Sequence, residues 1–93
     1  MKVKRGQDGI QIEPGHTVVG AHVIVDGMAV QSVVLSRRYF AEFVHRATEK
    51  NKGRPIYGIP TALAQFDDSI ALHPLPDQEY EIRLTLQPPT VQI

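Results

Sequence analysis

The sequence predicts an α+β domain in which a small antiparallel sheet of two hairpins packs against one helix. Three observations lead to this prediction. Two β-branched runs flank Asp26-Gly27, two alternating runs flank Pro76-Asp77, and a segment with apolar residues at helical spacing lies between the two pairs. Since 93 residues bury only one modest core, we expect a single domain. We place a polar N-terminal arm at residues 1–16, the domain at 17–88 and an extended tail at 89–93.

The first hairpin is predicted over residues 17–25 and 28–35, and the arm before it carries at most a short strand near Ile10–Ile12. Asp-Gly between apolar runs is a strong hairpin signal, because a type I′ turn needs positive φ at both central residues. Pairing Val25 with Met28 sets the register. The face expected to meet the core then carries Val19, Ala21, Val23, Val25, Met28, Val30, Ser32 and Val34. The other face has His22 opposite Gln31 and is expected to be partly wet.

The helix is predicted over residues 36–50. Ser36 is a suitable N-cap, and Asn51-Lys52-Gly53 ends the helical pattern. An apolar stripe at helical spacing is expected to pack against the sheet, as aromatic stripes usually do. Its members are Tyr39, Phe40, Phe43, Val44 and Ala47.

The second hairpin is predicted over residues 69–73 and 79–87, where apolar and polar residues alternate. Pro76-Asp77 sets the turn, because proline fixes φ and aspartate tolerates the bend. Before it, residues 53–60 read as an extended segment, and residues 61–67 fit either a strand or a single turn. Pro88-Pro89 is expected to take the tail away from the sheet edge.

The composition narrows the classes of protein. The absence of cysteine excludes disulfides and thiolate metal sites, no apolar run reaches the length of a membrane span, and the N-terminus lacks the apolar core of a secretory signal. An intracellular setting is therefore expected. The net charge is zero, but residues 1–54 carry a balance of +4 and residues 55–93 a balance of −4. Such a distribution suits association between copies, although the charges could also simply decorate solvated faces.

No cluster of residues predicts chemistry. The four histidines lack metal-ligand spacing, and His45 and His73 are expected at the surface. Asp67-Asp68 reads as a loop cap, because neighbouring strand residues point to opposite faces. No nucleophile motif and no phosphate-binding glycine pattern is present. We therefore expect no catalytic residues, no cofactor, no metal site and no sequence-specific contact with nucleic acid.

The order of the motifs resembles the β-rich part of the head-to-tail adaptor (neck) proteins of tailed bacteriophages. The resemblance covers roughly residues 22–88. The matching stretches are Val25-Asp26-Gly27, Gly53-Arg54-Pro55-Ile56-Tyr57, Ile70-Ala71-Leu72-His73-Pro74-Leu75-Pro76-Asp77 and Tyr80-Glu81-Ile82-Arg83-Leu84. In that family, helices flank the β-rich part and engage the portal or neighbouring copies. This sequence lacks matching flanks, so a portal-binding role does not carry over.

The resemblance implies a non-enzymatic structural component of a tailed-phage virion, in the neck, tail or baseplate, assembled in the host cytoplasm. Its expected partners are other virion proteins and further copies of itself, with no membrane contact. An alternative is a small phage-encoded inhibitor or regulator that binds a host protein, and a third is an accessory domain of an enzyme. The expected contacts are the exposed sheet edge, a stiff hairpin tip and the C-terminal tail. The residues expected in the tip and tail are Pro74, Leu75, Pro76, Asp77, Gln78, Pro88, Pro89, Val91 and Ile93.

Overall fold

The computed structural model describes residues 1–89, which form one helix and nine strands. The strands of the N-terminal half are β1 (Lys2–Val3), β2 (Gly9–Gln11), β3 (Thr17–Val25) and β4 (Met28–Val34). The helix α1 (Arg37–Lys50) follows. The remaining strands are β5 (Tyr57–Gly58), β6 (Ala62–Phe66), β7 (Ser69–His73), β8 (Leu75–Pro76) and β9 (Tyr80–Gln87).

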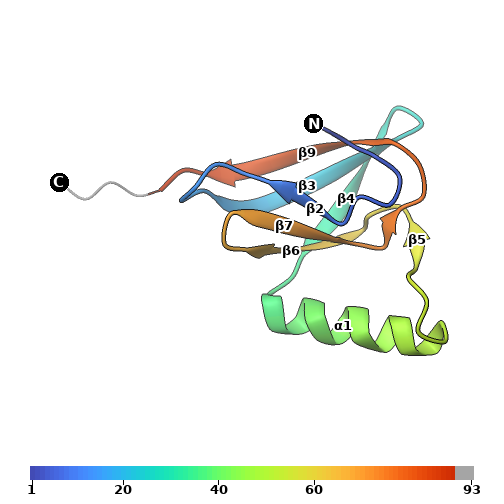
Figure 1. Ribbon diagram of the computed structural model, residues 1–93. Coiled ribbons are helices and arrows are strands. Elements are labelled where there is room, and N and C mark those ends of the chain that lie inside the picture. Colours follow the sequence, from blue (N-terminus) through green and yellow to red (C-terminus); the bar gives the residue numbers. More distant parts are fainter. Residues whose placement is uncertain (90–93) are drawn as a thin grey trace.

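Seven of these strands form one mixed sheet that curls into a nearly closed barrel (Figure 1). The order across the sheet is β1-β9-β3-β4-β6-β7-β2, and β5 and β8 form a separate parallel pair. The helix lies alongside the barrel rather than inside it (Figure 1). The α+β class with one helix is therefore confirmed, but a sheet made of only two hairpins is wrong.

The hairpin of β3 and β4 is confirmed in both its turn and its register. Val25 pairs with Met28, and φ is 50° at Asp26 and 79° at Gly27. These positive values are what a type I′ turn requires.

The predicted core face of this hairpin is only partly correct. Ala21, Val23 and Ser32 are buried, but Val19 is more than half exposed and Met28 is 72% exposed. Two causes explain the difference. The register of β3 against β9 shifts between Val18 and Gly20, so Val19 is an extra bulged residue and Val18 turns inward in its place. Met28 lies at the hairpin end, and the end of β4 there has only β3 as a strand neighbour among residues 1–89.

The predicted hairpin of residues 69–73 and 79–87 does not form. β7 pairs with β6 and β2, whereas β9 pairs with β3 and β1. The segment between them is not a tight turn, because β8 pairs in parallel with β5. Alternation identified both strands, but it carries no information on which strand each would join.

Two segments contribute more to the sheet than their composition suggested. Residues 61–67, which fitted either a strand or a turn, contain β6, paired in parallel with β4 and antiparallel with β7. The polar arm at residues 1–16 supplies β1 and β2 at the two ends of the sheet order. Val3 and Ile10 of these short strands are buried.

The core fills the inside of the curled sheet. Alternate residues of β9 point inward, with Tyr80 and Ile82 buried and Glu81 and Arg83 exposed. Side chains from β1, β2, β3, β6, β7 and β9 take part. The buried cluster consists of Val3, Ile10, Val18, Ala21, Val23, Leu63, Ile70, Leu72, Tyr80 and Ile82.

The helix begins as predicted, but its apolar stripe is mostly not buried. The Ser36 side chain accepts a hydrogen bond from the Tyr39 backbone N–H, and Asn51 caps the other end. Phe40 is the only buried residue of α1, since Phe43 is 50% and Tyr39 69% exposed. The helix lies beside β6 and β7 (Figure 1), and its contact with the barrel is narrow because it centres on Phe40.

Phe40→Ala is expected to lower the free energy of unfolding by about 3–5 kcal/mol, the range for a buried phenylalanine. The Phe40 ring meets Phe66 and His73 edge-to-face, with centroids 6.1 and 6.5 Å away. Phe43→Ala is expected to cost only about 1 kcal/mol, since this half-exposed ring loses one aromatic contact. Urea unfolding of both variants measures the difference, and equal losses would contradict the narrow contact.

Candidate functional site

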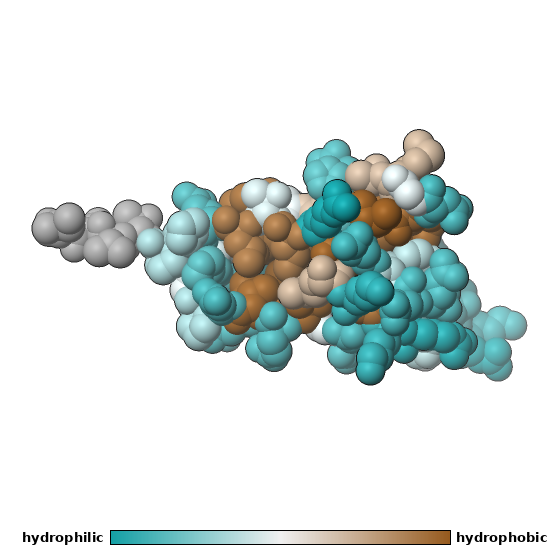
Figure 2. Space-filling view, turned by 90° about the horizontal axis from the view of Figure 1, so that it is seen from above, coloured by the Kyte–Doolittle hydropathy of each residue, from teal (hydrophilic) through white to brown (hydrophobic). Residues whose placement is uncertain are grey.

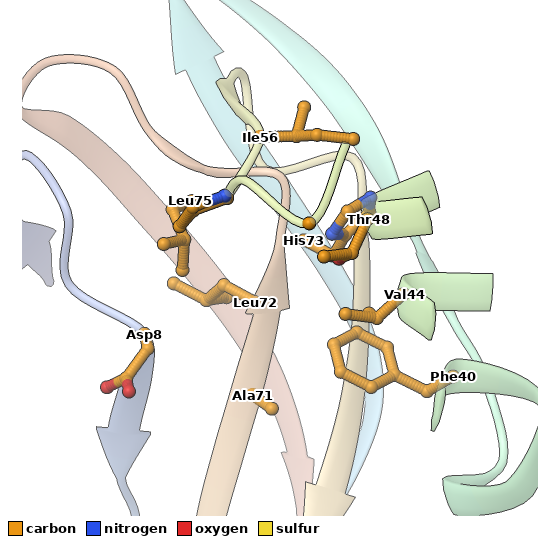
Figure 3. A pocket seen from close by; sticks show the side chains of 11 residues that line it. Asp8, Phe40, Val44, Thr48, Ile56, Ala71, Leu72, His73 and Leu75 are labelled. Carbon is orange, nitrogen blue, oxygen red and sulfur yellow. The ribbon is translucent and has the colours of Figure 1, made fainter. Parts of the chain in front are cut away.

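A cavity of about 330 Å³ lies between α1 and the barrel (Figure 3). Phe40, Val44 and Thr48 line it from the helix, and residues of β7 line it from the barrel. Its full lining is Asp8, Phe40, Val44, Thr48, Gly53, Pro55, Ile56, Ala71, Leu72, His73 and Leu75. This volume is at the lower end of the range for small-molecule pockets, about 300–1,000 Å³.

His73 is the one histidine in this lining, and the prediction that it lies at the surface is wrong. Its side chain is at the end of β7 and only 7% of the residue is exposed. The rings of Phe40 and Phe43 meet it edge-to-face, with centroids 6.5 and 5.2 Å away. Burial lowers the pKa of His73 below its ordinary value of 6.5. The folded protein therefore holds this imidazole in its neutral form near pH 7.

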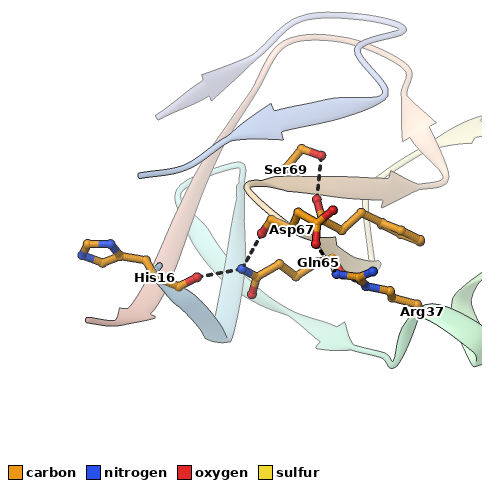
Figure 4. Close-up of polar contacts among 6 residues, drawn as sticks. His16, Arg37, Gln65, Asp67 and Ser69 are labelled. Atoms are coloured by element: carbon orange, nitrogen blue, oxygen red, sulfur yellow. Dashed lines mark hydrogen bonds and ion pairs between the residues drawn. The ribbon is translucent and has the colours of Figure 1, made fainter. Parts of the chain in front are cut away.

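A polar network occupies another side of the barrel, around Gln65 of β6 (Figure 4). The Gln65 amide donates to the carbonyls of His16 and Asp67 at 2.7 and 2.9 Å, and its oxygen accepts from the Val18 N–H at 2.9 Å. Asp67 lies in the β6–β7 turn with φ of 55°, and its carboxylate pairs with Arg37 at 2.9 Å. Asp67 thus serves the turn, as predicted for the Asp67-Asp68 pair, and it also contacts the first residue of α1.

The chemistry open to these side chains is limited. Among residues 1–89, no three His, Asp or Glu side chains gather in a way that could hold a metal ion. The His73 cavity is mainly aliphatic and aromatic, with Asp8 as the acidic member of its lining. Such surroundings suit packing, or the binding of an apolar group, better than proton transfer.

The two most exposed aromatic side chains of residues 1–89 lie on the helix, next to apolar residues at the end of β4. We call Val33, Leu35, Tyr39 and Phe43 the helix–β4 face. Val33 is 54% exposed and Leu35 is partly exposed, in addition to the exposed rings of Tyr39 and Phe43. Two shallow grooves of about 350 and 390 Å³ run across it and share Leu35 and Phe43. Clustered apolar exposure of this kind is a feature of many surfaces that contact another molecule.

Apolar residues are also visible on the side of the barrel seen from above, away from α1 (Figure 2). There they lie between polar side chains. The helix–β4 face differs in carrying two exposed aromatic rings on one helix.

Basic and acidic side chains are unevenly distributed in space, but the boundary does not fall between residues 1–54 and residues 55–93. The Lys2 Nζ atom lies 3.7 Å from the Glu79 Oε1 atom, and Arg37 pairs with Asp67. Basic residues of the first half of the sequence therefore lie beside acidic residues of the second half. Residues 37–54, which form α1 and the turn after it, carry six basic and two acidic side chains, a balance of +4. The rest of the chain carries −4, since the net charge is zero. The helix layer is therefore basic and the barrel acidic.

The predicted contact residues fall at two separate places. Within the expected tip, Pro76 is buried in β8 while Asp77 and Gln78 are exposed. Pro88 and Pro89 are exposed beyond the other end of β9, which is about 25 Å long at the usual rise per residue. Val91 and Ile93 lie outside the described residues. The structure thus places Pro88 and Pro89 at the opposite end of β9 from the expected tip.

The helix–β4 face was missed in the sequence because its aromatic residues were assigned to the core. One signal could have found it. Val33 and Leu35 fall on the hairpin face that was predicted to be partly wet, and they run directly into the helix. Apolar residues on a face expected to be wet, continuous with an aromatic stripe, are the sequence signal of an exposed apolar patch.

Comparisons with protein-family models, with curated proteins and with solved structures found no match to this chain. Within residues 1–89, the helix is too short and too polar to cross a membrane.

The depressed pKa of His73 predicts a loss of stability in mild acid. As the pH falls through 6.5, His73 takes up a proton in the unfolded chain before it does so in the folded protein. The free energy of unfolding therefore decreases from pH 6.5 down to the lower pKa of the folded protein. His73→Phe keeps an aromatic ring at this position but cannot titrate, so its free energy of unfolding should change less with pH in this range. Urea unfolding between neutral and mildly acidic pH measures this pH dependence, with His22→Phe at an exposed position as the control. Equal slopes for wild type and His73→Phe would contradict the assignment.

Proposed function

We propose that the protein is a non-enzymatic structural component of a tailed-phage virion, in the neck, tail or baseplate, and that it works through protein–protein contacts. The observation that carries this proposal is the helix–β4 face. Tyr39 and Phe43 are the kind of side chain that dominates protein interfaces, and they are 69% and 50% exposed, with one contact of the Phe43 ring made to His73. The proposed partners are other virion proteins and further copies of the chain, assembled in the host cytoplasm.

The charge separation supports docking between proteins. A basic helix layer and an acidic barrel are complementary to each other on neighbouring copies, and Arg38 and Arg46 flank the exposed rings on α1. Charges at the rim of an interface mainly set orientation and association rate, so assembly should weaken with added salt.

The virion setting rests on the order of the motifs in the sequence, and several of these motifs have definite roles in this fold. Asp26-Gly27 makes the β3–β4 turn, and Pro76 is buried where β8 meets β5. Tyr80 is buried, and its hydroxyl donates to the Asp77 carboxylate. This hydrogen bond, together with burial, raises the pKa of Tyr80.

Phe43→Ser is expected to exclude the protein from purified particles while leaving the barrel folded, since half of this ring is exposed and its contacts would lie in the interface. Tyr57→Ser is the matched control, because Tyr57 is an aromatic residue of equal exposure, 49%, away from this face. Mass spectrometry of particles purified from the producing host measures incorporation, and thermal melting checks the fold.

Absence of the wild-type protein from particles would contradict the virion assignment. Recovery with one host protein instead would favour the regulator. Equal incorporation of Phe43→Ser and Tyr57→Ser would remove the helix–β4 face from the proposal.

Removing residues 88–93 tests the predicted contribution of the tail. The chain leaves the sheet after Gln87, so the truncated protein should keep its melting temperature. If Pro88, Pro89, Val91 and Ile93 are contacts, the truncated protein should assemble to a smaller size, as measured by light scattering. Assembly to the same size with the same partners would show that the tail is dispensable.

A further inference from the structure

One long stretch of sheet edge has no strand beside it within residues 1–89. β4 pairs with β3 from Met28 to Ser32, but on its other side it pairs with β6 only at Val33 and Val34. The hairpin therefore extends past the barrel, as the loop at the end of β3 and β4 shows (Figure 1). Met28, Ala29, Val30 and Gln31 are all exposed, so no other part of the described chain covers this edge.

The backbone groups on this edge can be assigned from the neighbouring hydrogen bonds. The N–H groups of Val33 and Leu35 donate to Thr61 and Leu63, toward β6. Because N–H and C=O alternate sides along a strand, Ala29 and Gln31 must point their N–H and C=O groups to the same side. These four groups are available for pairing.

The composition of this edge lacks the devices that keep sheet edges apart. Met28–Val34, with the sequence MAVQSVV, contains no charged residue and no proline. Soluble proteins normally blunt an exposed edge with lysine, proline, a bulge or a very short strand. The two ends of the sheet follow this rule, since β1 has two residues and β2 has three. The free edge of β4 does not.

We propose that this edge of β4 pairs antiparallel with the same edge of a second copy. This inference deepens the proposed function by naming a partner for self-association. A two-fold axis at Val30 would set Ala29 of each copy opposite Gln31 of the other, as hydrogen-bonded pairs. Val30 would then face Val30 of the second copy as a non-hydrogen-bonded pair, and the pairing would end before Ser32, where Thr61 lies beside β4.

Charge favours a second copy as the occupant. The stretch from Met28 to Leu35 is uncharged, so two identical edges meet without repulsion.

Single cysteines test the register, because the natural chain has none. In the proposed dimer, the two Val30 Cα atoms lie about 4.5 Å apart, within the range that a disulfide spans. The two Met28 Cα atoms lie about four residues apart along the strand, roughly 13 Å, which is too far. Under mild oxidation, Val30→Cys should cross-link almost completely and Met28→Cys should stay mostly monomeric. Met28 is 72% exposed and Val30 36%, so random collision would give the opposite order.

A second pair of variants tests the edge without cysteine. Gln31→Lys places a charge on the free edge, whereas His22→Lys places the same charge on its cross-strand partner, whose strand is paired on both sides. Gln31→Lys should weaken dimerisation at least tenfold in analytical ultracentrifugation, and His22→Lys should leave it unchanged. Hydrogen exchange should show concentration-dependent protection at Ala29 and Gln31.

A wild-type protein that stays monomeric at all accessible concentrations, or a Met28→Cys variant that cross-links as well as Val30→Cys, would overturn the proposal. Particle incorporation is measured separately. A monomer found in particles would overturn the edge pairing alone, and a β4-paired dimer absent from particles would overturn the virion assignment alone.

Discussion

β3 is hydrogen-bonded to β9 on one edge and to β4 on the other, and the barrel is built outward from these two pairings. The pairing with β9 joins residues 17–24 to residues 81–87, which lie near opposite ends of the chain. Closing so long a loop costs conformational entropy, and the buried residues along both strands must offset it. The bulge at Val19 is part of this solution, because it lets both Val18 and Ala21 face the core.

Gln65 supplies hydrogen bonds to backbone groups that the sheet leaves unpaired. Its single amide satisfies backbone groups at the start of β3 and in the β6–β7 turn, where no sheet partner is available. Partly buried backbone groups need such partners, since leaving them unpaired costs free energy. Through Asp67 and Arg37, the same turn also contacts the start of α1. The Gln65 side chain thus links β3 to the β6–β7 turn, and Asp67 of that turn contacts the helix through Arg37.

The shallow seating of α1 connects the fold to the proposed function. A curled sheet presents a convex outside, so a straight helix touches it along a line and buries mainly Phe40. Tyr39 and Phe43 of the apolar stripe remain largely exposed beside the last residues of β4, whereas Val44 and Ala47 are half-buried. The helix–β4 face and the uncharged β4 edge are therefore neighbours along the chain. The face exposes apolar side chains and the edge exposes unpaired backbone groups, and both kinds of group are stabilised by a partner. A small barrel with two such surfaces is suited to a place within a larger assembly.

The sequence by itself determined the local structure of this protein. Asp26-Gly27 specified the first turn, Ser36 the helix start, and the alternation in residues 69–73 and 80–87 identified two half-buried strands, because these signals act between neighbours in the chain. Which strands pair was decided only by tertiary structure, since alternation is the same for every possible partner. The bulge at Val19 and the burial of His73 likewise depend on segments more than twenty residues away. The apolar stripe of α1 was correct as a pattern, but how much of it is buried depended on the curvature of a sheet that no local signal describes.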